Sequence, residues 1–259
     1  MQQLFYADAK PISVSAHADL SVKTGEDFSF ATDANAVPLL AAEFPAASVE
    51  YPIVFAGSNE ALMPVALLGA RGRRNLFLDG AGKWNARYVP AFVRRYPFVF
   101  AQSPDGERLA LCIDEQYTGC NRDGRGERLF DADGERTAYL EQVIGFLRAY
   151  QQQHTRTRAF CDKLRSLDLI VPAEAILRGD TDDRPALSGL RVIDRQKLKA
   201  LDAKTVFALL QRDELELLFQ HLHSLANLRA LGERLLRAAD DTAPASAEQE
   251  DERSDTVVH

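Results

Sequence analysis

The hydrophobic pattern of this 259-residue chain changes its period near residue 134, and this change constrains the fold more than any other feature. Before it, short apolar runs alternate with turn residues, as in strands joined by tight connections. The strand candidates are residues 51–55, 64–68, 75–78, 96–100 and 109–113. After it, Leu140, Val143, Ile144 and Leu147 recur at the spacing of one helical face. The pattern therefore predicts strands first and helices second.

The order of these elements predicts the fold class. Strands that follow one another without intervening helices pair mostly antiparallel. We therefore expect an α+β fold, in which a mostly antiparallel sheet in the N-terminal half packs against C-terminal helices. The first helical segment is compatible with one long helix or two, and it ends before Pro172. A short strand-like piece at 190–193 follows, and Asp194, Asp202 and Asp213 are suited to cap later helices.

Length and composition predict a single large domain with a short tail. A chain of 259 residues with 46% hydrophobic content can bury a substantial core. We expect one domain over residues 1–239, rich in strands over 1–130 and in helices over 131–239. Residues 240–259 contain seven acids, one arginine and little apolar surface, which predicts a disordered acidic tail.

Charge and targeting signals narrow the functional classes. The net charge is −7, and the tail accounts for nearly all of it, so the body is close to neutral. Nucleic-acid binding is not expected, because it needs a basic face. The first residues lack the basic start and apolar run of a secretory signal, and no apolar stretch is long enough to span a membrane. With three cysteines and no C-x-x-C pair, a reducing cytoplasm is the expected location.

A leucine repeat marks the last helical segment. Leu215, Leu218, Leu222 and Leu225 line one face. This repeat is compatible with a homodimer formed through the last helix, but a helix packed on its own sheet has the same stripe, and we favour that interpretation.

Several sequence blocks recur in a fixed order along the chain. They include His17, Trp84 and residues 37–39 (VPL), 51–55 (YPIVF), 75–79 (NLFLD), 94–98 (RRYPF), 111–115 (LCIDE), 129–134 (LFDADG), 189–194 (GLRVID) and 221–225 (HLHSL). Together these blocks resemble the bacterial SapC family over roughly residues 1–235. The ordered set is far more specific than any one block.

The resemblance has limited functional content. The family name implies a link to bacterial surface-layer biology, and some members carry a transporter-permease label that this composition does not fit. Genes of the family often lie beside those of halogenase-like flavoproteins and TonB-dependent receptors. This association implies an accessory role in uptake or tailoring of a small molecule or glycan, with a flavoenzyme as a partner.

Residues 84–98 are the richest candidate for a ligand site, because aromatic and basic side chains alternate along them. The candidates are Trp84, Tyr88, Arg94, Arg95 and Tyr96. Ring faces can stack on a cyclic group, and arginine pairs bidentately with carboxylate or phosphate, so the mixture suits a small anionic or cyclic ligand. The structural alternative is that the rings form core while the two arginines pair with Asp114 and Glu115 on a neighbouring strand.

Carboxylates and histidines offer fewer routes to chemistry. Asp114 and Glu115 are adjacent on a strand, so their side chains should point to opposite faces. A glycosidase-like pair would need a further acid such as Glu43. His221 and Ser224 share a helical face and are compatible with half of a nucleophile and base arrangement, although G-x-S-x-G is absent. Packing or a tethering hydrogen bond is the favoured role for this pair.

Metal and cofactor motifs are not found. The five histidines include no His-Glu-x-x-His, which removes the usual helical zinc site. Residues 69–72 and 80–83 are rich in glycine but match neither the phosphate loop nor the dinucleotide fingerprint. No metal site and no cofactor are predicted.

Three functional hypotheses follow from these observations. The first is a non-catalytic accessory protein that binds a small ligand or a partner through residues 84–98. The second is an enzyme whose site is assembled from distant residues, namely His17, Glu43, Arg94, Asp114 and His221. The third is a structural component of a surface layer.

Overall fold

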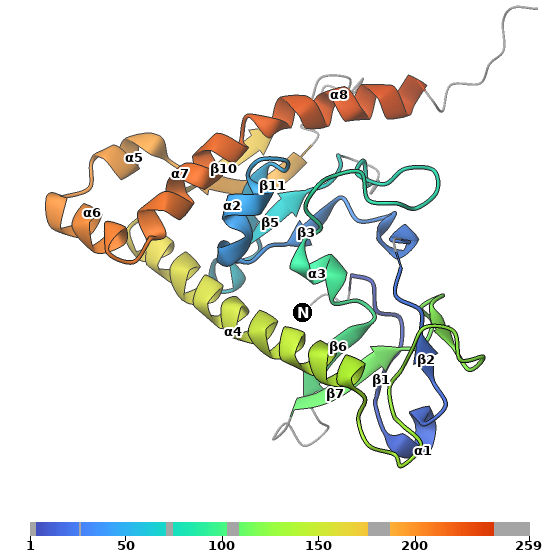
Figure 1. Cartoon of the computed structure of the whole chain (residues 1–259). Helices are drawn as coiled ribbons and strands as arrows, with labels where there is room; N and C mark the ends of the chain where they lie inside the picture. Colours follow the sequence, from blue (N-terminus) through green and yellow to red (C-terminus); the bar gives the residue numbers. More distant parts are fainter. Residues whose placement is uncertain (1–3, 26, 71–74, 103–108, 176–186, 241–259) are drawn as a thin grey trace, which may run out of the picture.

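The structure is a computed structural model, which describes residues 4–25, 27–70, 75–102, 109–175 and 187–240. It confirms the predicted α+β class (Figure 1). The strands are β1 (Ala9–Pro11), β2 (Ser21–Val22), β3 (Ala36–Pro38), β4 (Ile53–Ala56), β5 (Met63–Leu67), β6 (Phe98–Gln102), β7 (Leu109–Asp114), β8 (Cys120–Asn121), β9 (Glu127–Arg128), β10 (Ile170–Ala175) and β11 (Leu187–Ile193). All pairings between these strands are antiparallel, as expected.

The α-helices are α1 (Val14–His17), α2 (Phe44–Ala47), α3 (Ala91–Arg94), α4 (Ala138–Ser166), α5 (Arg195–Lys199), α6 (Ala203–Leu210), α7 (Glu214–Ser224) and α8 (Asn227–Asp240). Three 3-10 turns accompany them, η1 (Ser29–Ala31), η2 (Ala41–Glu43) and η3 (Asn59–Ala61). In the part of the chain that is described, no helix is both long and apolar enough to cross a membrane.

The strands form three sheets rather than one. Their orders are β1-β7-β6, β10-β11-β4-β5-β3 and β8-β2-β9. The largest sheet joins the two halves of the chain, because β10 and β11 come from the region predicted to be helix-rich. Strand β11 extends the predicted piece at 190–193, whereas β10 was not predicted.

The strand predicted at 75–78 is wrong. Asn75 is buried, and its side chain accepts a hydrogen bond from the Phe77 N–H at 2.9 Å and donates one to the Ala31 carbonyl at 3.3 Å. The bond to Phe77 belongs to a turn, and the bond to Ala31 joins this turn to η1. A single bridge between Leu78 and Trp84 is the only strand-like pairing nearby in the described chain.

The predicted helical stripe belongs to one continuous 29-residue helix, α4. Thr137 caps it, since its hydroxyl accepts a hydrogen bond from the Leu140 N–H. Figure 1 shows α4 running from the β1-β7-β6 sheet at one end to α6 and α7 at the other. Two hydrophobic clusters lie along α4. The larger one includes residues of the five-stranded sheet, and the smaller one includes residues of β6 and β7. Phe146 packs against both clusters.

The C-terminal helices begin where the acidic caps predict. Asp194 and Asp202 cap α5 and α6 by accepting backbone N–H bonds. Asp213 precedes α7 but makes no capping bond, because its backbone is left-handed with a φ of 58°. The chain also breaks between α7 and α8, which was not predicted.

The leucine stripe of α7 faces the interior of the protein. Leu218 is buried, and Leu215, Leu222 and Leu225 pack against the larger cluster. The homodimer through the last helix stays a prediction, as does the single domain over residues 1–239. The predicted tail at 240–259 lies outside the described residues except for Asp240, the last residue of α8.

Candidate functional site

A pocket of about 370 Å³ lies between the first turns of α4, the segment that joins α3 to β6, and residues 22–25 and 27–30. Aromatic rings form much of its wall, contributed by Phe28, Phe30, Tyr96, Tyr117, Tyr139 and Phe146. Arg94, Arg95, Asp27 and Gln142 supply polar groups. Apolar walls with a few polar groups are typical of small-molecule sites. We call this space the aromatic pocket.

Arg95 is the buried cation of the aromatic pocket. Only 8% of its surface is exposed, and its Nε has no hydrogen-bond partner among the described residues. The guanidinium lies over the ring of Phe92 at 4.2 Å and over that of Tyr150 at 4.9 Å. No described carboxylate forms an ion pair with it. Among the described residues its charge therefore faces aromatic rings, including that of Tyr6 at 5.7 Å, although a buried cation is normally paired with an opposite charge.

Arg94 stands at the exposed side of the same pocket. Its guanidinium carbon lies 5.4 Å from the ring centre of Phe146 and 5.6 Å from that of Tyr88. Its Nε donates a 2.9 Å hydrogen bond to the Val89 carbonyl, which fixes the direction of the side chain. Among the described residues it too has no carboxylate partner, so both arginines remain available to an anion.

Tyr96 lies at the centre of the ring cluster. Its ring is 4.3 Å from that of Phe30 and 5.4 Å from that of Tyr117, between centroids. Burial raises the pKa of Tyr96 to about 12, and the nearby carboxylate of Asp114 acts in the same direction. The phenol is therefore neutral at physiological pH.

The other residues of the 84–98 block support this site from outside the pocket. Trp84 donates a 2.8 Å hydrogen bond to the Tyr51 hydroxyl, which in turn donates a very short bond to the Tyr88 carbonyl. Tyr88 donates to the buried carboxylate of Glu43 at 2.7 Å, and Arg94 donates to the Tyr88 hydroxyl at 3.4 Å. The Tyr88 hydroxyl thus links Glu43 to Arg94, and these hydrogen bonds hold the segment in place rather than forming part of the pocket wall.

The predicted alternative, in which the two arginines pair with Asp114 and Glu115, is wrong. Asp114 is fully buried, and its carboxylate accepts hydrogen bonds from the Ala7 N–H at 2.8 Å and the Gln116 N–H at 3.1 Å. Arg94 is the last residue of α3 and Arg95 is its C-cap, so both arginines lie before β6 rather than on it.

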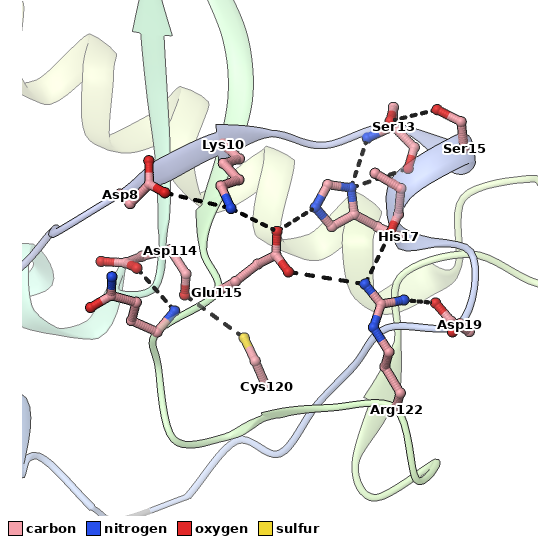
Figure 2. A network of polar contacts seen from close by, with 12 residues as sticks. Asp8, Lys10, Ser13, Ser15, His17, Asp19, Asp114, Glu115, Cys120 and Arg122 are labelled. Carbon is pink, nitrogen blue, oxygen red and sulfur yellow. Dashed lines mark hydrogen bonds and ion pairs between the residues drawn. The ribbon is translucent and has the colours of Figure 1, made fainter.

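Glu115 lies at the centre of a separate polar network, shown in Figure 2. Its carboxylate is 3.5 Å from His17 Nε2, 3.9 Å from Lys10 Nζ and 4.0 Å from an Arg122 nitrogen. His17 is 1% exposed, and its Nδ1 accepts a 3.1 Å hydrogen bond from the Ser13 N–H. The ring places Nε2 on the side of Glu115. This network fastens β1 and α1 to the end of β7.

His221 and Ser224 are buried where α7 meets the large sheet. His221 Nε2 accepts the Ile193 N–H at 3.0 Å, and the ring lies 5.2 Å from that of Phe55. Ser224 accepts the Ile53 N–H at 3.0 Å and donates to the His221 carbonyl at 2.6 Å. The hydroxyl therefore meets the backbone of His221 and not its imidazole. Both side chains satisfy strand N–H groups, in agreement with the favoured tethering role.

Sequence reasoning found three residues of the pocket, Arg94, Arg95 and Tyr96, and missed the walls opposite them. Tyr139, Gln142, Val143 and Phe146 recur at i, i+3, i+4 and i+7, which is a second helical stripe offset by one residue from the one that was recognised. Its aromatic content was the available signal. Within the described ranges, no group of three or more His, Cys, Asp or Glu side chains is arranged to hold a metal ion.

The fold and the pocket define an α+β protein with a ring-lined cavity and two arginines that have no acidic partner in the described part of the chain. The chain belongs to the SapC family, whose sequence model it matches over residues 12–231. Neither the comparison with curated proteins nor that with solved structures gave a match.

Proposed function

We propose that this protein is a non-catalytic binding protein whose aromatic pocket takes a small anionic ligand that contains a ring. Arg94 and Arg95 carry the proposal, because both residues line the pocket, Arg95 is buried, and neither has an ion-pair partner among the described residues. Burying a cation is costly unless an opposite charge compensates it. A ligand carboxylate, sulfonate or phosphate would supply that charge.

The walls of the pocket favour a ring on the same ligand. The rings of Phe30, Tyr96 and Tyr117 already pack against one another at 4.3–6.2 Å, so they are held in place before a ligand enters. Walls that are ordered in advance reduce the entropy lost on binding. Arg94, at the exposed side, is placed to steer an anion toward Arg95.

The biological setting of this proposal is an accessory role in the cytoplasm. It rests on the family resemblance, because genes of the family often lie beside those of halogenase-like flavoproteins and nutrient-uptake systems. In that role the protein presents or retains a small molecule for a partner flavoenzyme. The alternative functions remain an enzyme whose site is assembled from distant residues and a structural component of a surface layer.

Titration calorimetry with three probes tests the proposal. The probes are 1-naphthoate, which has a ring and a negative charge, 1-naphthylmethylamine, which has the ring and a positive charge, and acetate, which has the charge alone. We expect binding of 1-naphthoate, at least tenfold weaker binding of the amine, and none of acetate. Probes that bind weakly are sufficient, because the test compares only the order of their affinities for the protein.

Three variants assign the binding to the pocket. Arg94→Ala and Arg95→Lys should each weaken 1-naphthoate binding by about tenfold, because a lost bidentate contact to a carboxylate is worth about 1.4 kcal/mol or more. Arg156→Ala, which removes an exposed arginine farther along α4, is the matched control. Equal affinity in the folded variants and the wild type would exclude this pocket, and turnover of a probe would favour the enzyme.

A further inference from the structure

Helix α6 is an apolar helix whose side chains mostly face solvent. Its sequence is AKTVFALL, and Leu209 is its buried residue. Phe207 is 60% exposed and Leu210 is 55% exposed, and their i, i+3 spacing places them on one face. On the neighbouring helix α7, Phe219 is 44% exposed. Large apolar side chains exposed on neighbouring helices are a signal of an interaction site.

Basic residues outnumber acids in the segment that carries α5 and α6. Residues 194–212 contain five lysines and arginines and two acids, in a chain whose net charge is −7. Both acids, Asp194 and Asp202, are occupied as helix caps. Lys197 pairs with Asp168 at 2.5 Å. The remaining cations Arg195, Lys199, Lys204 and Arg212 are exposed and form no ion pair with any described residue.

The face lies at an extremity of the molecule. Figure 1 shows α5 and α6 projecting beyond the last turns of α4, where Lys163 pairs with Glu214 at the start of α7. The aromatic pocket lies on the first turns of the same helix. Along a 29-residue helix the two ends are about 40 Å apart. A surface bound to α6 would therefore leave the pocket open.

We propose that the α5–α6 end docks onto an anionic lipid surface. Phe207 and Leu210 would enter the headgroup region, while Lys199, Lys204 and Arg212 meet lipid phosphates. A second copy of the chain is the less suitable occupant, because a two-fold contact through this face would bring its uncompensated cations together. The lipid supplies both the apolar environment and the opposite charge.

Vesicle flotation with the full-length chain tests the proposal. The vesicles are phosphatidylcholine alone, or phosphatidylcholine and phosphatidylglycerol at a 3:1 ratio. We expect flotation with the anionic vesicles, little with the neutral ones, and a several-fold loss when salt is raised from about 0.15 M to 0.5 M because of charge screening. Phe207→Ser/Leu210→Ser and Lys199→Glu/Lys204→Glu should each reduce the bound fraction at least fivefold.

Val49→Ser provides the matched control, since Val49 is 66% exposed and lies outside these helices. It should float like the wild type, and circular dichroism should show that every variant is folded. Absence of flotation with anionic vesicles would overturn the proposal, as would equal flotation of the Phe207 and Leu210 variant. A wild-type dimer that this variant dissociates would also overturn it, by showing that a second copy covers the face.

Discussion

Tyr88 donates a 2.7 Å hydrogen bond to the buried carboxylate of Glu43, and this contact joins segments 45 residues apart in the sequence. The same carboxylate accepts the N–H groups of Leu40 and Ala91, each at 2.7 Å. Glu43 therefore satisfies the beginning of η2 and the beginning of α3 together. Since α3 leads directly to Arg94 and Arg95, this one acid positions the polar side of the aromatic pocket.

Replacing Glu43 by alanine should destabilise the protein by about 3–5 kcal/mol, because three donors lose their acceptor in a buried position. Urea unfolding followed by circular dichroism measures the effect. Glu43→Gln, which keeps one carbonyl oxygen, should cost less than the alanine substitution. Glu60→Ala, at an exposed site in η3, should change the free energy of unfolding by less than about 0.5 kcal/mol. Equal midpoints for Glu43→Ala and wild type would contradict this role.

Local signals in the sequence predicted the local parts of this fold. The caps at Asp194 and Asp202 and the stripe of α4 depend on residues within a turn or two of one another, so they could be recognised directly. Strand β10 could not, because Pro172 indicated a stop. The structure places β10 at the edge of its sheet, which is the position in a sheet where proline is usually found.

The candidate site divides in the same way. Arg94, Arg95 and Tyr96 are consecutive, so their combined chemistry was visible in the sequence. Their environment depends on Phe30 and Phe146, which lie more than 45 residues away in either direction, and a single sequence carries no record of such proximity. The pairing of the arginines with Asp114 and Glu115 was predicted wrongly for this reason.

Ser224 should prove structural rather than catalytic. Ser224→Ala leaves the Ile53 N–H without its acceptor inside the protein, which should cost about 1–3 kcal/mol of unfolding free energy. Ser166→Ala removes an exposed hydroxyl that bonds to the Lys163 carbonyl, and it serves as the control with a change below about 0.5 kcal/mol. If Ser224→Ala were as stable as the control, the tethering role would be wrong.

The contacts of Glu115 should contribute modestly to the free energy of unfolding, and this contribution should decrease as the salt concentration rises. Its side chain is 32% exposed, so the contacts to Lys10 and Arg122 are largely screened, whereas His17 is 2% exposed at its side chain and depends on Glu115 more strongly. Glu115→Ala should cost about 1–2 kcal/mol at low salt. Glu141→Ala breaks an exposed pair with Arg136 and should cost less than about 0.5 kcal/mol. Equal costs for the two substitutions would show that His17 gains nothing from Glu115.

His221 should make stability depend on pH between about 4 and 6.5. Burial lowers the pKa of His221 from 6.5 to about 4 in the folded protein, so the unfolded chain binds the extra proton throughout that window. The contribution of His221 to the free energy of unfolding is therefore fully present above pH 6.5 and is lost as the pH drops toward 4. The slope approaches 1.4 kcal/mol per pH unit, and the total loss is about 3 kcal/mol.

Comparison with His221→Gln isolates this contribution. Glutamine can still accept the Ile193 N–H but does not titrate, so the variant should be less stable near neutral pH, since it loses the ring contact with Phe55, and should lose less stability as the pH falls. Urea unfolding from pH 4.5 to 7.5 measures the difference. His154, whose pKa is also lowered by burial, is present in both proteins and cancels. His223→Gln, two residues away on the exposed side of α7, should follow the wild-type curve. Parallel curves for His221→Gln and wild type would mean that the imidazole of His221 becomes protonated without unfolding.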